Sequence, residues 1–196
     1  MNKVAAVIVV LAAIVAAAGT SPPLMQDQEE ALTAIDTVPS RTLYDSLQLD
    51  KPLDQATLQA VASDGSASPA FRLRAIHALS TYCAAMSGSA CDNDPAHVTL
   101  TGLISTNGSA QSGADLLILR GAVESIGLMR DPNDEGVLAN LLNHPSRDIR
   151  ATAALALGAL CNAAAINPLH QRLTNESTDQ VKLAISAALR MLSACP

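Results

Sequence analysis

Aromatic residues are almost missing from this chain of 196 residues, which has one Phe, two Tyr and no Trp. The usual stacking platforms for single-stranded nucleic acid or sugars are therefore lacking. Basic residues are also scarce, since 12 Lys and Arg stand against 18 Asp and Glu, a net charge of −6. Binding to nucleic acid or to an anionic membrane in a general way needs a dense basic patch. The composition thus argues against both functions.

Motifs of common enzyme and metal sites are missing as well. The sequence has no C-x-x-C, no G-x-S-x-G, no phosphate-binding glycine loop and no H-E-x-x-H among its four histidines, which are His77, His97, His144 and His170. The stretch from Asp131 is similar to the start of an EF-hand loop, but Leu142 stands where the bidentate Glu is required. Asp92-Asn93-Asp94 could contact a cation, but an acidic turn is the preferred interpretation. We predict no catalytic, cofactor-binding or metal-binding set, and no enzyme.

The first eighteen residues have the pattern of a signal peptide. Lys3 gives a short positive start, Val4 to Val15 is an apolar run, and Ala16-Ala17-Ala18 fits a signal-peptidase site. The apolar stretch is shorter than the roughly 20 residues that span a bilayer, although an uncleaved membrane anchor is the alternative. We expect a signal peptide over 1–18, a polar linker over 19–40 with a short helix near its end, and one domain over 41–196. The protein is expected to be exported, either periplasmic or secreted.

Export makes disulfides the expected state of the four cysteines. Three connectivities are open to Cys83, Cys91, Cys161 and Cys195. The most local one, Cys83–Cys91 with Cys161–Cys195, is preferred. It would close a loop rich in Gly, Ser, Asp and Asn, and it would tie the C-terminal tail to an earlier helix. Four buried free thiols in a reducing compartment are the alternative.

Helix start signals recur along the domain. Ser68-Pro69, Asp94-Pro95 and Asp131-Pro132 each place a capping side chain before a proline at the first helical position. Capping boxes are predicted where Ser112 precedes Asp115 and where Ser177 precedes Gln180. Apolar residues recur at helical spacing between these starts, and strand-like alternation is not found after residue 18. The fold is predicted to be all-α.

One helical pattern occurs four times. In each occurrence an apolar residue is followed by a position that is usually basic, then by a small or apolar residue three further on and a large aliphatic residue seven further on. The four starts are Phe71-Arg72, Ile118-Leu119, Ile149-Arg150 and Val181-Lys182, which are 47, 31 and 32 residues apart. A period in this range predicts a helical solenoid. Each such helix has a preceding partner whose expected apolar face is Leu58 with Val61, Val98 with Leu100 and Leu103, Val137 with Leu138 and Leu141, or Ile166 with Leu169 and Leu173.

The stretch from His144 to Gly158 resembles the second helix of a HEAT repeat, of the short kind first noted in phycobilin lyases, with its V-R-x-x-A-x-x-x-L-G pattern. The other three helices keep parts of it, with Ser80, Leu119, Lys182 and Arg190 as departures. The resemblance implies a right-handed solenoid of about four helix pairs that presents a surface to protein partners. It also implies that the basic positions Arg72, Arg150 and Lys182 pair with acids of adjacent units, for which Glu124, Asp148 and Asp179 are candidates. A basic stripe that binds an acidic partner is the alternative.

The expected function is therefore an exported HEAT-repeat scaffold that binds an unidentified protein partner, without catalytic chemistry, cofactor or nucleic acid. Two alternatives remain open. One is an enzyme or pigment-handling protein that uses a groove between repeats and needs polar groups such as His77 to converge there. The other is an envelope-organising module held at the membrane by an uncleaved N-terminus.

Overall fold

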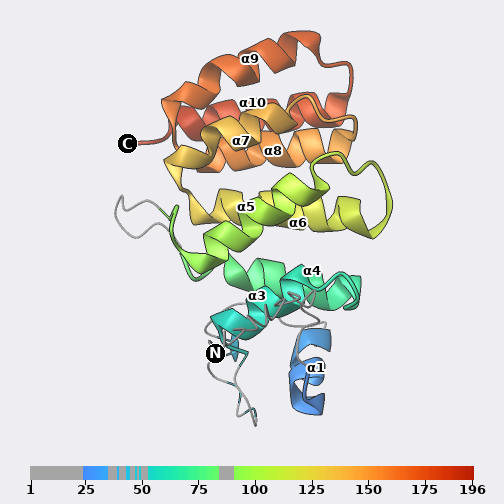
Figure 1. Cartoon of the computed structure of the whole chain (residues 1–196). Coiled ribbons are helices and arrows are strands. Elements are labelled where there is room, and N and C mark those ends of the chain that lie inside the picture. Colours follow the sequence, from blue (N-terminus) through green and yellow to red (C-terminus); the bar gives the residue numbers. More distant parts are fainter. Residues whose placement is uncertain are drawn as a thin grey trace, which may run out of the picture.

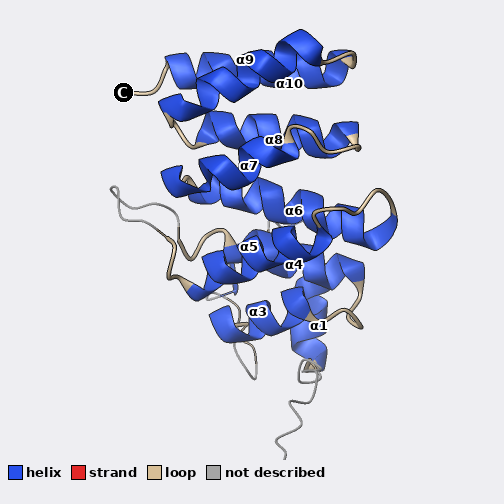
Figure 2. Ribbon diagram, turned by 45° about the horizontal axis from the view of Figure 1, so that its top comes forward, coloured by secondary structure: helices blue, strands red, loops and turns tan. Residues whose placement is uncertain are grey.

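The structure, a computed structural model, describes residues 24–34, 39, 43–44, 47, 49, 53–83 and 91–196. These residues form helices and connecting turns and no strand (Figure 2). The predicted signal peptide over 1–18 lies outside them. The helices are α1 (Gln26–Thr33), α3 (Gln55–Ser63), α4 (Pro69–Leu79), α5 (Pro95–Asn107), α6 (Gly113–Met129), α7 (Glu135–Leu141), α8 (Arg147–Ala159), α9 (Ile166–Asn175) and α10 (Asp179–Ser193), with 3₁₀ turns η1 (Pro132–Asp134) and η2 (Ala163–Ala165).

The helices from α3 to α10 are arranged as four successive pairs. Each pair packs a first helix against the second helix that follows it, as α3 with α4, α5 with α6, α7 with α8, and α9 with α10. The second helices α4, α6, α8 and α10 also pack against one another in that order, so the pairs follow one another along a single axis (Figure 1). This is the α-solenoid that the fourfold pattern predicts, and the four patterned stretches are its second helices.

The second helices approach one another closely because small residues lie at their crossings. A Cβ added at Gly127 of α6 would lie 2.7 Å from the Cβ of Ala156 on α8, and one added at Gly158 of α8 would lie 2.7 Å from the Cα of Ala188 on α10. Larger side chains at these positions would push the helices apart. Arg190 occupies the same repeat position as Gly158 and is exposed on α10.

The core runs without interruption between the two layers of helices. Its largest fully buried side chains include Leu58, Leu79, Leu100, Leu119 and Leu138. A helix pair alone would leave much of this apolar surface in water, whereas stacking covers it from both sides. The chain needs few aromatic residues because alanines and leucines fill the space between closely packed helices.

The expected apolar faces of the first helices are correct only in part. Leu58, Leu100, Leu138 and Leu169 are buried as expected, but Val98, Val137 and Ile166 are exposed. These three residues lie near the beginnings of α5, α7 and α9. A first helix packs mainly on its own pair and only weakly on the neighbouring first helices, so its buried stripe is narrower than the sequence pattern suggests.

Part of the segment expected to be a linker is a helix of the folded body. Helix α1 packs against α4, and its Ala31 and Leu32 are buried together with the aliphatic part of Gln28. The polar run of residues 26–30 indicated a linker, but two consecutive apolar residues after it are enough to anchor one helical face. Helix α1 therefore covers the end of the stack at α4 (Figure 1).

Two of the predicted helix starts are capped as expected. Asp94 accepts a hydrogen bond from the amide of Ala96 at the start of α5, and Asp131 accepts one from the amide of Asn133 at the start of η1. Ser68 and Ser112 precede α4 and α6 but make no capping bond. The capping box at Ser177 is wrong, since α10 begins after Thr178 and Gln180 donates to Asp148 instead. The Glu176 carboxylate accepts from the amides of Ser177 and Thr178 and so replaces the predicted cap.

The four cysteines are arranged in two pairs at disulfide distance. Cys83 lies against Cys91 and Cys161 against Cys195, with Cα–Cα distances of 5.9 and 5.6 Å. These are the pairs preferred from the sequence. The first joins the end of the first helix pair to the start of the second, and the second joins the turn after α8 to the C-terminal tail.

We predict that the natural protein contains no free thiol. Because both pairs have the Cα spacing that a disulfide requires, oxidation needs no movement of the backbone. Alkylation of the native protein from its own compartment, followed by peptide mass mapping, should leave all four cysteines unmodified and show the peptides linked in these two pairs. Alkylation of all four would refute the assignment.

Candidate functional site

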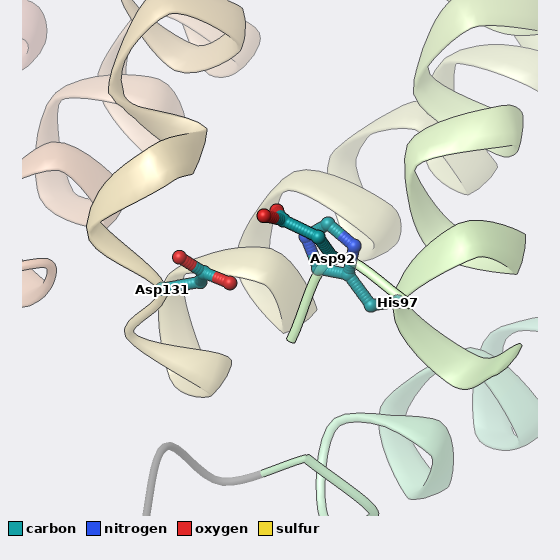
Figure 3. A group of neighbouring side chains, drawn as sticks. All are labelled: Asp92, His97 and Asp131. Atoms are coloured by element: carbon teal, nitrogen blue, oxygen red, sulfur yellow. The ribbon is translucent and has the colours of Figure 1, made fainter. Parts of the chain in front are cut away.

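Buried polar side chains gather where the second helix pair meets the third. His97 on α5 lies with its Nε2 atom 2.9 and 3.0 Å from the two carboxylate oxygens of Asp134 in η1. Asp131, at the start of the same turn, is fully buried, and Asp92 approaches from the loop after Cys91. Figure 3 shows Asp92 and His97 together, with Asp131 reaching toward them from the neighbouring segment.

This cluster has the donor atoms of a metal site. Asp92, His97 and Asp131 each offer one ligand atom, and these atoms all lie within 4.8 Å of one another. Carboxylate oxygens with an imidazole nitrogen suit divalent transition metals such as Zn²⁺ or Mn²⁺. The sequence motifs contain Asp92 and Asp131 separately and did not predict the cluster. Its members are far apart in the sequence and come together only through the stacking of two units.

Hydrogen bonds within the protein account for the same side chains without an ion. One oxygen of Asp131 accepts from the amide of Asn133 and the other from the amide of Cys91. The Asn133 side chain donates in turn to Asp92 at 3.0 Å. These bonds tie the turn of the third unit to the start of the second. Asn162, which is 31 residues after Asp131, repeats the arrangement by capping η2 and donating to the carbonyl of Pro132 at 2.9 Å. The cluster therefore acts as a joint between units.

The His97–Asp134 contact should make stability depend on pH. The hydrogen bond to Asp134 raises the pKa of His97, against the opposing effect of burial, and Asp131 and Asp92 raise it further. A His pKa that is higher in the folded state adds stability that is fully present below the unfolded pKa of about 6.5 and is lost as the pH rises through the folded pKa. His97→Gln should therefore cost most stability near about pH 5.5 and progressively less toward about pH 9.

The measurement is chemical unfolding of wild type and His97→Gln at each pH. Taking the difference removes the contributions of His77 and His144, whose pKa values burial lowers and whose effects therefore run in the opposite direction. A difference that stays constant or grows with pH would contradict the assigned contact.

The structure does not bring His77 and His170 into one cleft. His77 lies on α4 in the first pair, with its Nε2 3.8 Å from a carboxylate oxygen of Glu124 on α6. His170 is exposed on α9 in the fourth pair. The convergence that a groove-based enzyme was expected to need is therefore not formed by these two residues. His144 is buried, and its Nδ1 accepts from the amide of Ser146 at 3.0 Å.

The expected pairing of basic residues between units is found at Arg150 but with a different partner. Arg150 donates from Nε and Nη2 to the two oxygens of Glu176, at 2.8 and 3.0 Å, and Glu176 lies at the end of α9 in the next unit. Arg72 instead donates from Nε to the carbonyl of Ala62 at 3.1 Å. Lys182 lies 3.9 Å from Asp179 within its own helix. The candidate partners Asp148, Asp179 and Glu124 were wrong for pairs between units: Asp148 accepts from Gln180, Glu124 lies near His77, and Asp179 lies in the same helix as Lys182.

Exposed and half-buried apolar side chains form a row across the second helices. The row consists of residues at two repeated positions, and we call it the outer row: Leu128 on α6, Leu155 and Ala159 on α8, and Ala187 and Met191 on α10. Leu128, Ala159 and Met191 are separated by one repeat each, as are Leu155 and Ala187. Equivalent positions on stacked helices point to the same side of a solenoid, so these residues share one side, where Glu124 stands on α6 at the position of Leu155 and Ala187.

A groove between α6 and α8 forms part of this row. It has a volume of about 240 Å³ and is lined mainly by apolar atoms of Leu128, Leu155 and Ala159, with Arg120 and Glu124 at its rim. Gly127 and Ala156 form its floor, so the small residues that allow close packing also leave the surface hollow. The sequence pattern over residues 144–158 predicted a helix but not this exposed face.

The comparison with protein families now identifies the architecture. Residues 110–190, from the turn before α6 to the last turns of α10, match the family model of HEAT repeats. This match supports the assignment to HEAT repeats that the resemblance of the sequence suggested. HEAT repeats generally mediate interactions between proteins. No curated protein sequence matches the chain.

Proposed function

We propose that this protein is an exported HEAT-repeat scaffold that binds another protein through the outer row of its second helices. The outer row is the observation that carries the proposal. Leu128, Leu155 and Met191 are large apolar side chains exposed on one side of successive second helices, and exposed apolar patches rimmed by polar groups are typical of protein interfaces. The charged rim at Arg120 and Glu124 would set the orientation of the partner.

Export is supported by two independent features. The N-terminal sequence has the pattern of a signal peptide, and the four cysteines are paired at disulfide distance. Among the described residues, no helix is both long and apolar enough to cross a bilayer. N-terminal sequencing of the mature protein separates a cleaved signal from an anchor, because cleavage after Ala18 would give a chain that starts at Gly19.

Crosslinking in the native host tests the binding face. The intact protein and a Leu128→Glu, Leu155→Glu double variant would be crosslinked in their own compartment, and the captured proteins would be identified by mass spectrometry. Both leucines are exposed, so the charges should remove the apolar contact without unfolding the protein. The expected result is a specific partner that wild type captures and the double variant does not.

Leu183→Glu is the matched control. Leu183 is 70% exposed and is the most exposed leucine of the described residues, but it occupies the repeat position of Ala151, which on α8 is covered in the stack. Leu183 therefore faces the end of the solenoid and not the outer row. This variant should capture the partner as wild type does. Equal capture by all three proteins, or capture of nothing by wild type, would contradict the proposed function.

A further inference from the structure

Arg72 and Arg150 occupy the same position in the repeat but differ in what they bind. Both side chains lie near the start of a second helix and both residues are almost buried, at 8% and 9% exposure. Arg150 has its guanidinium fully used, since Nη1 donates to the carbonyls of His144 and Pro145 while Nε and Nη2 hold the Glu176 carboxylate. Arg72 has one side-chain hydrogen bond, from Nε to Ala62.

The two Nη nitrogens of Arg72 have no hydrogen-bond partner among the described residues. In the fourth unit, the first helix α9 ends in Asn175 and is followed by Glu176. The Glu176 carboxylate accepts from Arg150 of the preceding unit. In the second unit, helix α5 ends in Asn107 and is followed by Gly108, which has no side chain to offer. The carboxylate that completes the arrangement at Arg150 is therefore missing at Arg72. The two Nη nitrogens remain accessible, so an acceptor that enters from outside could bind them and would add charge-assisted hydrogen bonds.

A pocket of about 530 Å³ takes the place of that carboxylate. Arg72 lines it together with Ser63 at the end of α3 and Thr106 near the end of α5. Two glycines, Gly65 and Gly102, also line it, and a Cβ at either would meet nothing within 4 Å. The space is within the range of small-ligand sites. The hydroxyl groups of Ser63 and Thr106 add donors on the wall that Arg72 shares.

We infer that this pocket is a carboxylate-binding site, in which the two oxygens of a ligand carboxylate accept hydrogen bonds from the Nη nitrogens of Arg72. Glu176 plays the corresponding part for the guanidinium of Arg150. A planar guanidinium recognises a carboxylate by two parallel bonds. Arg150 binds Glu176 through Nε and Nη2, whereas at Arg72 the Nε is bonded to Ala62 and the two Nη nitrogens offer the free edge. The carboxylate comes either from a free organic acid or from an acidic side chain of a bound protein. Asp115 also lines the pocket, so the site favours a single carboxylate accompanied by a hydrogen-bond donor over a dicarboxylate.

The site is separate from the outer row and does not depend on the proposed function. The pocket lies beside α3, α5 and the start of α6, whereas the outer row lies on α6, α8 and α10. A negative result in the test of one surface therefore does not count against the proposal for the other.

The test is an NMR titration of the intact protein, followed through the amide resonances of Gly65 and Gly102. The probes are lactate as a free organic acid, the capped peptide acetyl-Ala-Glu-Ala-amide, and the neutral peptide acetyl-Ala-Gln-Ala-amide as control. Saturable shifts with lactate alone indicate a free acid as ligand, and shifts with the Glu peptide alone indicate an acidic side chain. Either result supports the site. No saturable shift with either probe, or equal shifts with the Glu and Gln peptides, would overturn it.

A substitution at another residue of the pocket tests the site without removing Arg72, whose loss could unfold the protein. Thr106→Glu places a carboxylate inside the pocket, where it should occupy Arg72, raise stability and weaken the binding of either probe by about tenfold or more, since hydrogen bonds between charged groups are the strong ones. Thr106→Gln has the same size without the charge and should bind as wild type does. Binding that survives in Thr106→Glu at full strength would show that the probe binds elsewhere, and the proposal would fail.

Discussion

Replacing Glu176 by Gln is expected to lower the free energy of unfolding by about 3–5 kcal/mol, the range for breaking a buried ion pair on one side. The Glu176 side chain is fully buried and accepts from Arg150, Arg172 and the amides of Ser177 and Thr178. These bonds, with the Arg150 contact first, hold the pKa of Glu176 well below its usual range despite burial. Gln cannot balance the two guanidinium charges, so Arg150 would remain buried without its counter-ion.

The pH dependence of this effect has a definite sign. Because the pKa of Glu176 is lower in the folded state than in the unfolded state, the stability it contributes is present above the unfolded pKa of about 4.5 and is lost as the pH falls below it. The deficit of Glu176→Gln should therefore be largest near neutral pH and should shrink in acid.

Urea unfolding at several pH values measures both expectations. Glu124→Gln is the control, since the Glu124 side chain is about half exposed and its contact with His77 is 3.8 Å. An exposed pair of this kind contributes about 0–1 kcal/mol. If Glu176→Gln cost no more than this control, Glu176 would not be the element that joins the third and fourth units.

Truncating Leu157 to Ala is expected to cost about 2–5 kcal/mol, as for other large-to-small changes in a core. Leu157 is fully buried on α8, which packs against α6, α7 and α10. A cavity at this point would remove contacts with several helices at once. Neighbouring units could not close it easily, because Gly127 and Gly158 already bring the backbones as near as side chains allow.

Leu155→Ala on the same helix gives the matched comparison. Leu155 is 43% exposed, so its truncation should change the free energy of unfolding by no more than about 0.5 kcal/mol. Both variants have the same chemistry and the same helix propensity, and only burial differs. Equal costs for the two would show that the register of α8 in the stack is wrong.

The sequence predicted the stack because its strongest signal is repeated. Ile149, Ala153 and Leu157 form one buried stripe, and the same apolar pattern recurs in the other second helices at intervals of 47, 31 and 32 residues. A second helix is covered on three sides by its partner and its two neighbours, so its apolar pattern is broad and easy to recognise. The disulfide pairs were also predictable, since both are the most local choice.

Contacts between units were harder to predict. Arg150 was expected to pair across units, but its partner Glu176 lies in a turn whose position depends on how α9 packs. The His97–Asp134 contact joins residues that are 37 positions apart and belong to different units. Helical periodicity fixes which side of one helix is buried but not how far neighbouring units slide along each other. Polar joints, which require that register, became visible only in the structure.

The outer row was likewise not predictable from the sequence. Leu155 fits the helical pattern as well as Leu157 does, although one is exposed and the other buried. The sequence cannot separate an apolar residue that fills the core from one that faces outward at the edge of the stripe, because both have the spacing of an amphipathic helix.

Distances between spin labels on successive second helices test the stacked arrangement most directly. Labels carried by non-natural amino acids, which spare the cysteines, would be placed at the equivalent positions His77, Glu124, Leu155 and Ala187. Packed helices are about 8–10 Å apart, so pulsed electron resonance should give roughly one such step for 124–155, two for 124–187 and three for 77–187. Distances that increase in this order would confirm that the four pairs follow one another in a row. A 77–187 distance as short as 124–155 would show a closed globule and contradict the solenoid, and with it the binding face proposed for the outer row.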